Sequence, residues 1–257
     1  GITVISGEVG CGKTTIVHHL LSRLDYSRLR VGLIDTAHRA YGSLLKWIID
    51  AFRIEVEDSD DSALLIKLQN FIVEQFSDGK RTVVIIDEAQ NMSSNDLEAL
   101  RLLTNINGNG DQLLQIVLVG QPELLEKFYD PSMAQLAQRV SAEYNLSALD
   151  LRETIDYVHY RIKKAGSTQA LFQGSALQAV YYFSGGIPRI INTICDGALA
   201  VSYGREEKIV SVDTVLRVVR SKPIGGVNRL GMDRPDRESV RKKIQQCHDI
   251  DLLEAVR

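Results

Sequence analysis

Apolar residues in the first part of the chain fall into short continuous runs that alternate with segments of helical periodicity. The runs cover residues 2–6, 31–34, 82–86 and 114–119. Between them, apolar residues recur with the spacing of one helix face over 13–24, 44–52, 64–76 and 97–103. Strands that are apolar throughout are typical of a parallel sheet that is buried on both faces. The pattern therefore predicts an α/β domain, with a parallel sheet and helices on both faces.

The pattern changes after a last strand-like segment at residues 142–146. Only helical periodicity follows, over 151–163, 176–183, 188–201 and 212–219. Residues 217–243 then carry nine Lys or Arg against three Asp or Glu. Val240 and Ile244 permit a short amphipathic helix there, but such a charge run more often indicates a solvated or disordered extension. We expect three segments: an α/β domain over 1–147, a small all-helical domain over 148–222, and a polar, partly basic tail over 223–257.

Composition and charge narrow the classes of function. The 257 residues include 30 Lys or Arg and 33 Asp or Glu, a net charge of -3, so any DNA contact has to be local, with residues 217–243 as the candidate. No apolar run approaches the roughly 20 residues that span a bilayer. Cys11, Cys195 and Cys247 lack the spacing of a disulfide framework or a zinc site, which favours the reducing cytoplasm. Because the sequence opens on Gly1 and not on Met, we also expect a segment upstream.

A phosphate-binding motif stands between the first predicted strand and the first predicted helix. Residues 7–14 match G-x-x-x-x-G-K-[ST] at every fixed position. In this context the glycines let backbone N–H groups turn inward around a phosphate, and the start of the helix adds its positive dipole end. Lys13 would reach the β and γ phosphates, and the Thr14 hydroxyl would reach Mg²⁺. The candidate nucleotide-binding residues are Gly7, Glu8, Val9, Gly10, Cys11, Gly12, Lys13 and Thr14.

Two carboxylates follow the apolar run at residues 82–86. Asp87 and Glu88 come where a buried strand reaches the edge of its sheet. Asp87 would hold Mg²⁺ through a water, and Glu88 would orient or deprotonate the water that attacks the γ phosphate. On its own, a pair of acidic residues after an apolar strand is more often a solvated turn. Together with the phosphate loop it indicates a hydrolase.

Three further residues are candidates for contacts with phosphate. Gln121 follows the run at 114–119, so we expect it at the same sheet edge, where it would sense the γ phosphate. Arg139 precedes the strand-like segment at 142–146, and Arg189 follows Pro188 in the first turn of a predicted helix. Arginine suits a phosphate clamp because its planar fork stays charged. On their own, all three residues also fit ordinary turn or surface positions.

With these residues in view, residues 2–219 resemble the AAA+ ATPases, and specifically the ExeA/GspA-like group of general secretion ATPases. Five blocks in order carry the resemblance: GEVGCGKTT at 7–15, IIDEAQ at 85–90, VGQPEL at 119–124, QRV at 138–140 and GGIPRIIN at 185–192. The resemblance implies a P-loop NTPase fold with a helical lid, ATP and Mg²⁺ as cofactors, and Thr15 as a further nucleotide contact. It also implies that Gln121 is the first sensor, that Arg189 is the second sensor on the lid, and that Arg139 reaches a neighbouring subunit's nucleotide.

The resemblance further implies an ATPase that self-associates into a ring or a filament and uses hydrolysis as a conformational switch. Its partners would be proteins of a secretion, pilus or surface-polysaccharide assembly system. Two alternatives stay open. The same ATPase core also resembles transposition regulators. If the chain acts as one of these, residues 217–243 would bind DNA. The chain would otherwise be an ATP-binding scaffold without significant hydrolysis, although Asp87 and Glu88 argue against that. The family's adenine contacts precede the first strand and are not assigned in this chain.

Overall fold

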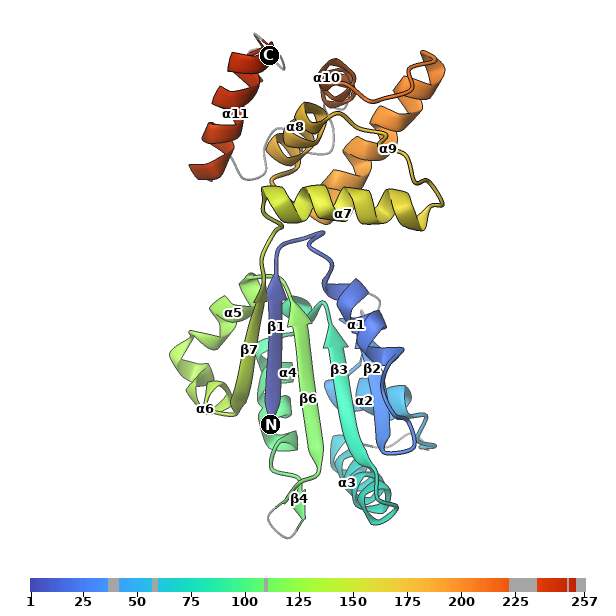
Figure 1. Cartoon of the computed structure of the whole chain (residues 1–257). Helices are drawn as coiled ribbons and strands as arrows, with labels where there is room; N and C mark the ends of the chain where they lie inside the picture. Colours follow the sequence, from blue (N-terminus) through green and yellow to red (C-terminus); the bar gives the residue numbers. More distant parts are fainter. Residues whose placement is uncertain (37–41, 57–59, 109–110, 222–234, 249, 253–257) are drawn as a thin grey trace. The chain divides into compact units, whose positions relative to one another are not determined.

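The computed structural model describes residues 1–36, 42–56, 60–108, 111–221, 235–248 and 250–252. The chain divides into two compact units, Gly1–Leu146 and Ser147–Arg257, shown in Figure 1. Each unit has a hydrophobic core of its own, so each is described by itself. In the described part of the chain, no helix has both the length and the apolar character needed to cross a bilayer.

The first unit is built on a five-stranded sheet. Its strands are β1 (Ile2–Gly7), β2 (Leu29–Asp35), β3 (Arg81–Asp87), β6 (Leu114–Gly120) and β7 (Val140–Leu146), in the spatial order β2-β3-β6-β1-β7. Every neighbouring pair is parallel, which confirms the predicted parallel sheet. The carboxyl ends of all five strands therefore meet at one edge of the sheet (Figure 1). We call this the carboxyl edge and the opposite one the amino edge.

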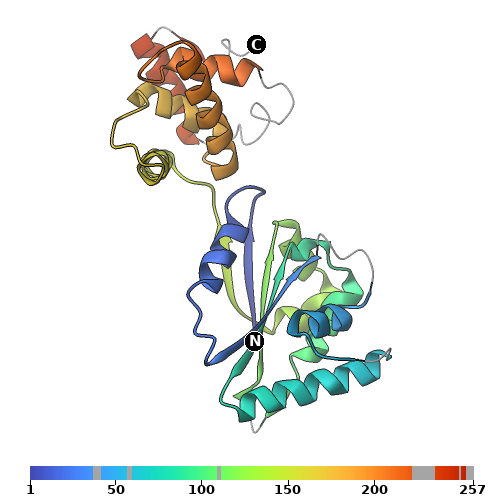
Figure 2. The ribbon, with the colours of Figure 1, turned by 90° about the vertical axis from the view of Figure 1, so that its right-hand side faces the viewer.

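Helices cover both faces of this sheet. They are α1 (Lys13–Leu21), α2 (Leu44–Phe52), α3 (Asp61–Ser77), α4 (Ser94–Leu103), α5 (Glu123–Phe128) and α6 (Ala134–Ala137), with the short 3₁₀ turns η2 (Ala89–Asn91) and η3 (Pro131–Met133) and the ribbon β4 (Asn107–Gly108) and β5 (Asp111–Gln112). Val84 of β3 lies in the large core that includes α2, α3 and α4. The next residue, Ile85, packs on the opposite face with Val17 of α1. Figure 2 views the sheet nearly edge-on, with α1 on one side and α2 and α3 on the other.

The described part of the second unit is helical apart from one isolated parallel bridge between Phe172 and Val210. Its helices are α7 (Leu151–Lys164), α8 (Gly174–Ser184), α9 (Pro188–Gly204), α10 (Val212–Ser221) and α11 (Pro235–His248). Asp150 and Glu153 form a capping box with bonds of 2.7 and 2.9 Å, which explains why α7 begins there. Between α8 and α9, Gly186 has a φ of 77°, and a Cβ at this position would lie 1.8 Å from the Leu149 carbonyl oxygen. This turn therefore requires glycine.

Helix α11 differs from the polar extension expected at the end of the chain. Residues 222–234 lie outside the described residues, but residues 235–248 form a helix. Val240 is 5% exposed and Ile244 is 1% exposed, and both belong to the core of the second unit. Two apolar residues four positions apart share one helix face, so this face can be buried despite the charges around it. A solvated or disordered extension is the wrong interpretation for residues 235–248.

Candidate functional site at the carboxyl edge of the sheet

The phosphate loop joins β1 to α1, and glycine shapes its backbone. Gly10 and Gly12 have φ angles of 85° and 104°, in the left-handed region that other residues rarely adopt. At Gly7, a Cβ would lie 2.7 Å from the backbone oxygen of Leu146 at the end of β7. The glycines of the motif are therefore required by backbone conformation and by close packing against the neighbouring strand.

The loop holds a buried cation together with unpaired backbone donors. Lys13 is 6% exposed, and its Nζ donates to the carbonyl oxygens of Gly7 at 2.7 Å and Glu8 at 3.0 Å. Within the described chain, the N–H groups of Gly12, Lys13 and Thr14 donate to no other group. These donors stand at the start of α1, where unpaired N–H groups and the helix dipole favour an anion. The loop has the features of a phosphate site.

The other loop positions contribute less to this arrangement. Cys11 is 7% exposed, and a Cβ at Gly7 would come 2.8 Å from its Sγ, so the thiol fills space behind the loop. Glu8, Val9 and Thr15 are exposed, and their contacts with a nucleotide stay a prediction. All three cysteines of the chain are free thiols.

The geometry fits a magnesium ion held by few protein ligands. The Thr14 hydroxyl donates to Asp87 Oδ2 at 2.9 Å, and Asp87 Oδ1 accepts from the Glu88 backbone N–H at 2.9 Å. Two hard oxygen ligands thus lie side by side beside the loop that would hold the phosphates. Across the described residues, there is no group of three or more His, Cys, Asp or Glu that could hold a metal. A hydroxyl and a carboxylate oxygen are hard ligands of the kind that Mg²⁺ takes beside waters and phosphate oxygens.

The backbone at Glu88 is held in an unusual conformation. Glu88 has a φ of 55°, in the left-handed region, although it is not glycine. The Thr36 hydroxyl, just after β2, donates to the Glu88 carbonyl oxygen at 2.6 Å and approaches the Asp87 carbonyl oxygen at 3.2 Å. Such conformations persist where the surroundings maintain them, often at functional sites. Thr36 supports the turn that places the two carboxylates, and no motif in the sequence had identified it.

The side chains of Glu88, Gln90 and Gln121 form one hydrogen-bonded group. Glu88 Oε2 accepts from Gln90 Nε2 at 2.6 Å and from Gln121 Nε2 at 3.4 Å. Gln90 Oε1 accepts from the Gln121 backbone N–H at 3.0 Å. The structure thus brings the predicted water-orienting residue and the predicted sensor together. Gln90 was quoted in the block at 85–90 without a role, and only its place in the turn η2 revealed the contact.

The two candidate arginines belong to other elements of the chain. Arg139 immediately precedes β7, and its carbonyl oxygen accepts from the Ile2 N–H at 3.0 Å, which places it at the amino edge. Its Nη2 donates to Asn105 Oδ1 at 2.9 Å. Arg189 is exposed in the first turn of α9, in the second unit. The structure does not bring Arg139 to the phosphate loop of its own chain.

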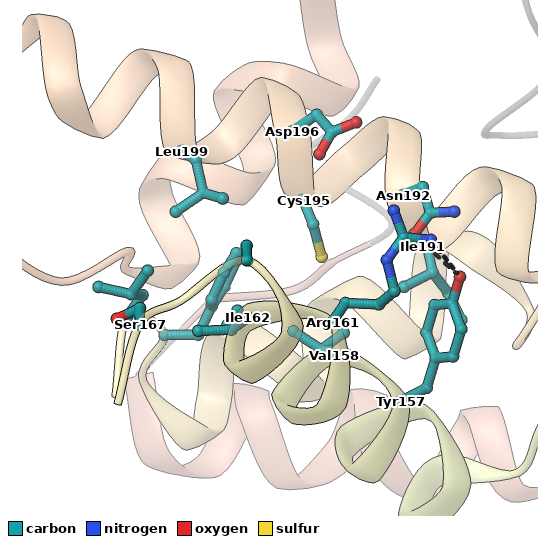
Figure 3. Close-up of a pocket in the computed structure, with 13 residues that line it drawn as sticks. Tyr157, Val158, Arg161, Ile162, Ser167, Ile191, Asn192, Cys195, Asp196 and Leu199 are labelled. Carbon is teal, nitrogen blue, oxygen red and sulfur yellow. Dashed lines mark hydrogen bonds between the residues drawn. The ribbon is translucent and has the colours of Figure 1, made fainter. Parts of the chain in front are cut away.

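A pocket of about 170 Å³ in the second unit has a different character (Figure 3). It lies between α7 and α9, and its apolar lining residues are Val158, Ile162, Ala165, Leu171, Phe172, Ile191 and Leu199. Burial raises the pKa of the Cys195 thiol in this pocket to about 12, and the Asp196 carboxylate adds to the shift. The thiol therefore stays protonated and is a poor nucleophile at neutral pH. The predicted nucleotide contacts are not among the residues that line this pocket.

Comparison with known proteins identifies the family. A family model described as "AAA domain" matches residues 1–128. General secretion pathway protein A of Aeromonas hydrophila is 40% identical over 218 residues, which make up 84% of this chain and 40% of that protein. The chain belongs to the AAA+ family. It spans about two fifths of the length of this relative, so the activity and partners of the whole relative are considered below as proposals.

Solved structures agree with this fold. Cdc6p from Pyrobaculum aerophilum has a TM-score of 0.67 at 17% identity and covers 87% of this chain and 61% of its own. Aeropyrum pernix ORC2 has a TM-score of 0.63 at 18% identity and covers 88% and 63%. The Thermotoga maritima RuvB branch migration motor has a TM-score of 0.54 at 17% identity and covers 95% and 68%. At these identities the likeness shows the fold, and the P-loop NTPase fold is confirmed.

Proposed function

We propose that this chain binds and hydrolyses Mg-ATP and works as an oligomeric conformational switch. One observation carries the proposal: the Thr14–Asp87 hydrogen bond joins the phosphate loop of β1 to the carboxylates of β3. This bond sets a phosphate cradle, a pair of metal ligands and a candidate base next to each other at the carboxyl edge. A phosphate site without Asp87 and Glu88 would still bind nucleotide, but it would lack the metal ligand and the base that are needed for water to attack the γ phosphate.

Each group has a separate task in this proposal. Lys13 exchanges its two carbonyl partners for the β and γ phosphate oxygens, which are stronger acceptors because they carry charge. Thr14 and Asp87 would hold Mg²⁺, which when bound would neutralise charge on the phosphate oxygens. Glu88 orients the attacking water and accepts its proton. Gln121 contacts the γ phosphate and distinguishes ATP from ADP.

The placement of Arg139 supports self-association. An arginine at the amino edge is exposed and is held near Asn105, so it is available to the nucleotide of a second copy. An arginine that acts in this way can accelerate phosphoryl transfer by roughly 10³ to 10⁵. Hydrolysis would then require assembly into a ring or a filament. The role of Arg189 as the second sensor stays a prediction.

Similarity to general secretion pathway protein A supports a role in the assembly of a secretion, pilus or surface-polysaccharide system. We propose that the chain acts on protein partners of such a system from the cytoplasm. The three free cysteines are consistent with a reducing compartment.

The alternative of DNA binding through residues 217–243 loses part of its support. The Arg241 guanidinium donates to both carboxylate oxygens of Asp251, at 2.6 and 2.9 Å. The Arg237 guanidinium lies 5.0 Å from the centre of the Tyr182 ring and donates to the Tyr182 carbonyl oxygen. Both charges are engaged by groups of the second unit and are therefore less available to phosphates.

The substitution Glu88→Gln tests the proposal, with Glu74→Gln, an exposed position on α3, as the matched control. We expect Glu88→Gln to bind ATP normally and to lower kcat by roughly 10² to 10³, within the range of roughly 10² to 10⁴ that is typical of general acid–base catalysis. The measurements are phosphate release and the affinity for a fluorescent ATP analogue. Equal turnover in the two variants would contradict the role of Glu88. ATPase assays with and without duplex DNA at low and moderate salt test the alternative, since DNA binding weakens steeply with salt.

A further inference from the structure

We propose that Gln90 is a positioning residue that holds the Glu88 carboxylate and couples it to Gln121. The inference rests on the proposed ATPase function and concerns the same site. It is carried by the contacts of the Gln90 side chain, which lies between the candidate base and the candidate sensor and is hydrogen-bonded to both residues.

The partners of Gln90 determine which way its amide group points. The backbone N–H of Gln121 can only donate, so the atom facing it at 3.0 Å must be Gln90 Oε1. The ionised Glu88 carboxylate can only accept, so the atom facing it at 2.6 Å must be Gln90 Nε2. Both ends of the amide are therefore used, and a flipped amide would lose both hydrogen bonds.

The two oxygens of Glu88 are left in different situations. Oε2 accepts from Gln90 and from Gln121, whereas Oε1 accepts from no group among the described residues. A carboxylate that takes a proton from water needs one free oxygen and a fixed orientation. The Gln90 bond supplies the orientation and leaves Oε1 for the water.

The two bonds to Glu88 also differ in strength. At 3.4 Å, the bond from Gln121 is beyond the usual range for N–H···O bonds, whereas the 2.6 Å bond from Gln90 is short and involves a charged acceptor. Gln121 can therefore leave Glu88 for a γ phosphate at little cost. Gln90 keeps the carboxylate in place when that happens.

The link from Gln90 to the segment after β6 is made at two points. Besides the bond to the Gln121 backbone, Lys127 Nζ on α5 donates to the carbonyl oxygens of Gln90 and Met92, both at 2.6 Å. At Gly120, a Cβ would lie 3.0 Å from Gln90 Oε1, so the absence of a side chain lets Gln90 approach the strand. A displacement of Gln121 is thus transmitted to the turn that carries Glu88.

The experiment compares Gln90→Met, which keeps the length of the side chain and removes the amide, with Asn91→Ala, an exposed neighbour in the same turn. In the full chain, we expect Gln90→Met to lower kcat about tenfold, because the orienting hydrogen bond to a charged group is lost. The KM for ATP and the affinity for a fluorescent ATP analogue should stay within about twofold of wild type, since no phosphate contact changes. Asn91→Ala should match wild type in both.

A second variant, Gly120→Ala, keeps Gln90 and disturbs its contact. The added Cβ meets Gln90 Oε1 at 3.0 Å and Leu124 Cδ2 at 2.9 Å, so we expect the same separation of kcat from KM, with thermal melting as the check that the fold is retained. If Gln90→Met has the kcat of the wild type while Glu88→Gln has a lowered kcat, the inference about Gln90 is overturned and the proposed function stands. Equal losses of affinity and kcat would also overturn it. Absent hydrolysis in the wild-type protein would overturn both.

Discussion

The two edges of the central sheet are built very differently. At the carboxyl edge, Lys13, Thr14 and Glu88 each hydrogen-bond to neighbouring groups of the same chain. At the amino edge, Arg139 is exposed and bonds to Asn105. The length of β1 separates the two edges, about 17 Å at the usual rise per residue of a strand. The carboxyl edge is thus organised in advance, whereas Arg139 lies at the far end of β1 from the phosphate loop of its own chain, and we propose that it serves a second copy.

This difference has a functional consequence. In the proposed mechanism, the carboxyl edge holds its own metal ligands and base and would bind nucleotide as a monomer. If the decisive positive charge comes from a second copy, turnover depends on assembly and binding does not. A variant of Arg139 at the amino edge should therefore lower kcat, whereas a variant of Lys13 at the carboxyl edge should weaken the affinity for ATP.

The largest effect is expected at the amino edge. Arg139→Ala should lower kcat by roughly 10³, because it removes a charge that stabilises the transition state, and it should leave ATP binding to the monomer unchanged. Mixing Arg139→Ala with Lys13→Ala should restore part of the activity, since the interfaces in which Lys13→Ala supplies the arginine to the phosphate loop of Arg139→Ala contain both intact groups. The measurement is phosphate release over a series of mixing ratios. Failure to recover activity at every ratio would rule out a shared site.

The next effect is expected at the carboxyl edge. Lys13→Ala should weaken ATP binding about a hundredfold, because a buried ammonium no longer bonds to the phosphates. Isothermal titration with a non-hydrolysable ATP analogue measures this loss. Lys208→Ala, at an exposed position in the second unit, is the control and should bind normally. Wild-type affinity in Lys13→Ala would disprove the phosphate loop assignment.

The smallest effect is expected for Asn105→Ala. The Asn105–Arg139 hydrogen bond is exposed, so its loss should lower kcat only about twofold to threefold through a less ordered arginine. The fold and the ATP affinity should not change, which thermal melting and analogue binding would check. A loss as large as that of Arg139→Ala would mean that Asn105 itself contacts the nucleotide or the neighbouring copy.

Much of the carboxyl edge could be predicted because local rules govern it. The loop glycines follow from positive φ angles and close packing, and the apolar strands follow from burial on both faces. The position of Arg139 was also within reach, since a residue that precedes a strand of a parallel sheet lies at its amino edge. The burial of α11 was missed because the charge of residues 217–243 outweighed the apolar pair Val240 and Ile244.

By itself, the sequence determined the phosphate loop, the two carboxylates and the parallel sheet that carries them, because each depends on neighbouring residues or on a simple periodicity. Tertiary structure alone decided that Gln90 joins Glu88 to Gln121 and that Thr36 supports the turn. The contacts of Gln90 with Gln121 and of Thr36 with Glu88 join segments that follow different strands, and their distances depend on the order β2-β3-β6. The periodicity of apolar residues predicts which face of a strand or helix a side chain lies on. It does not predict which strands are neighbours in the sheet, and the hydrogen bonds between the segments that follow them depend on that order.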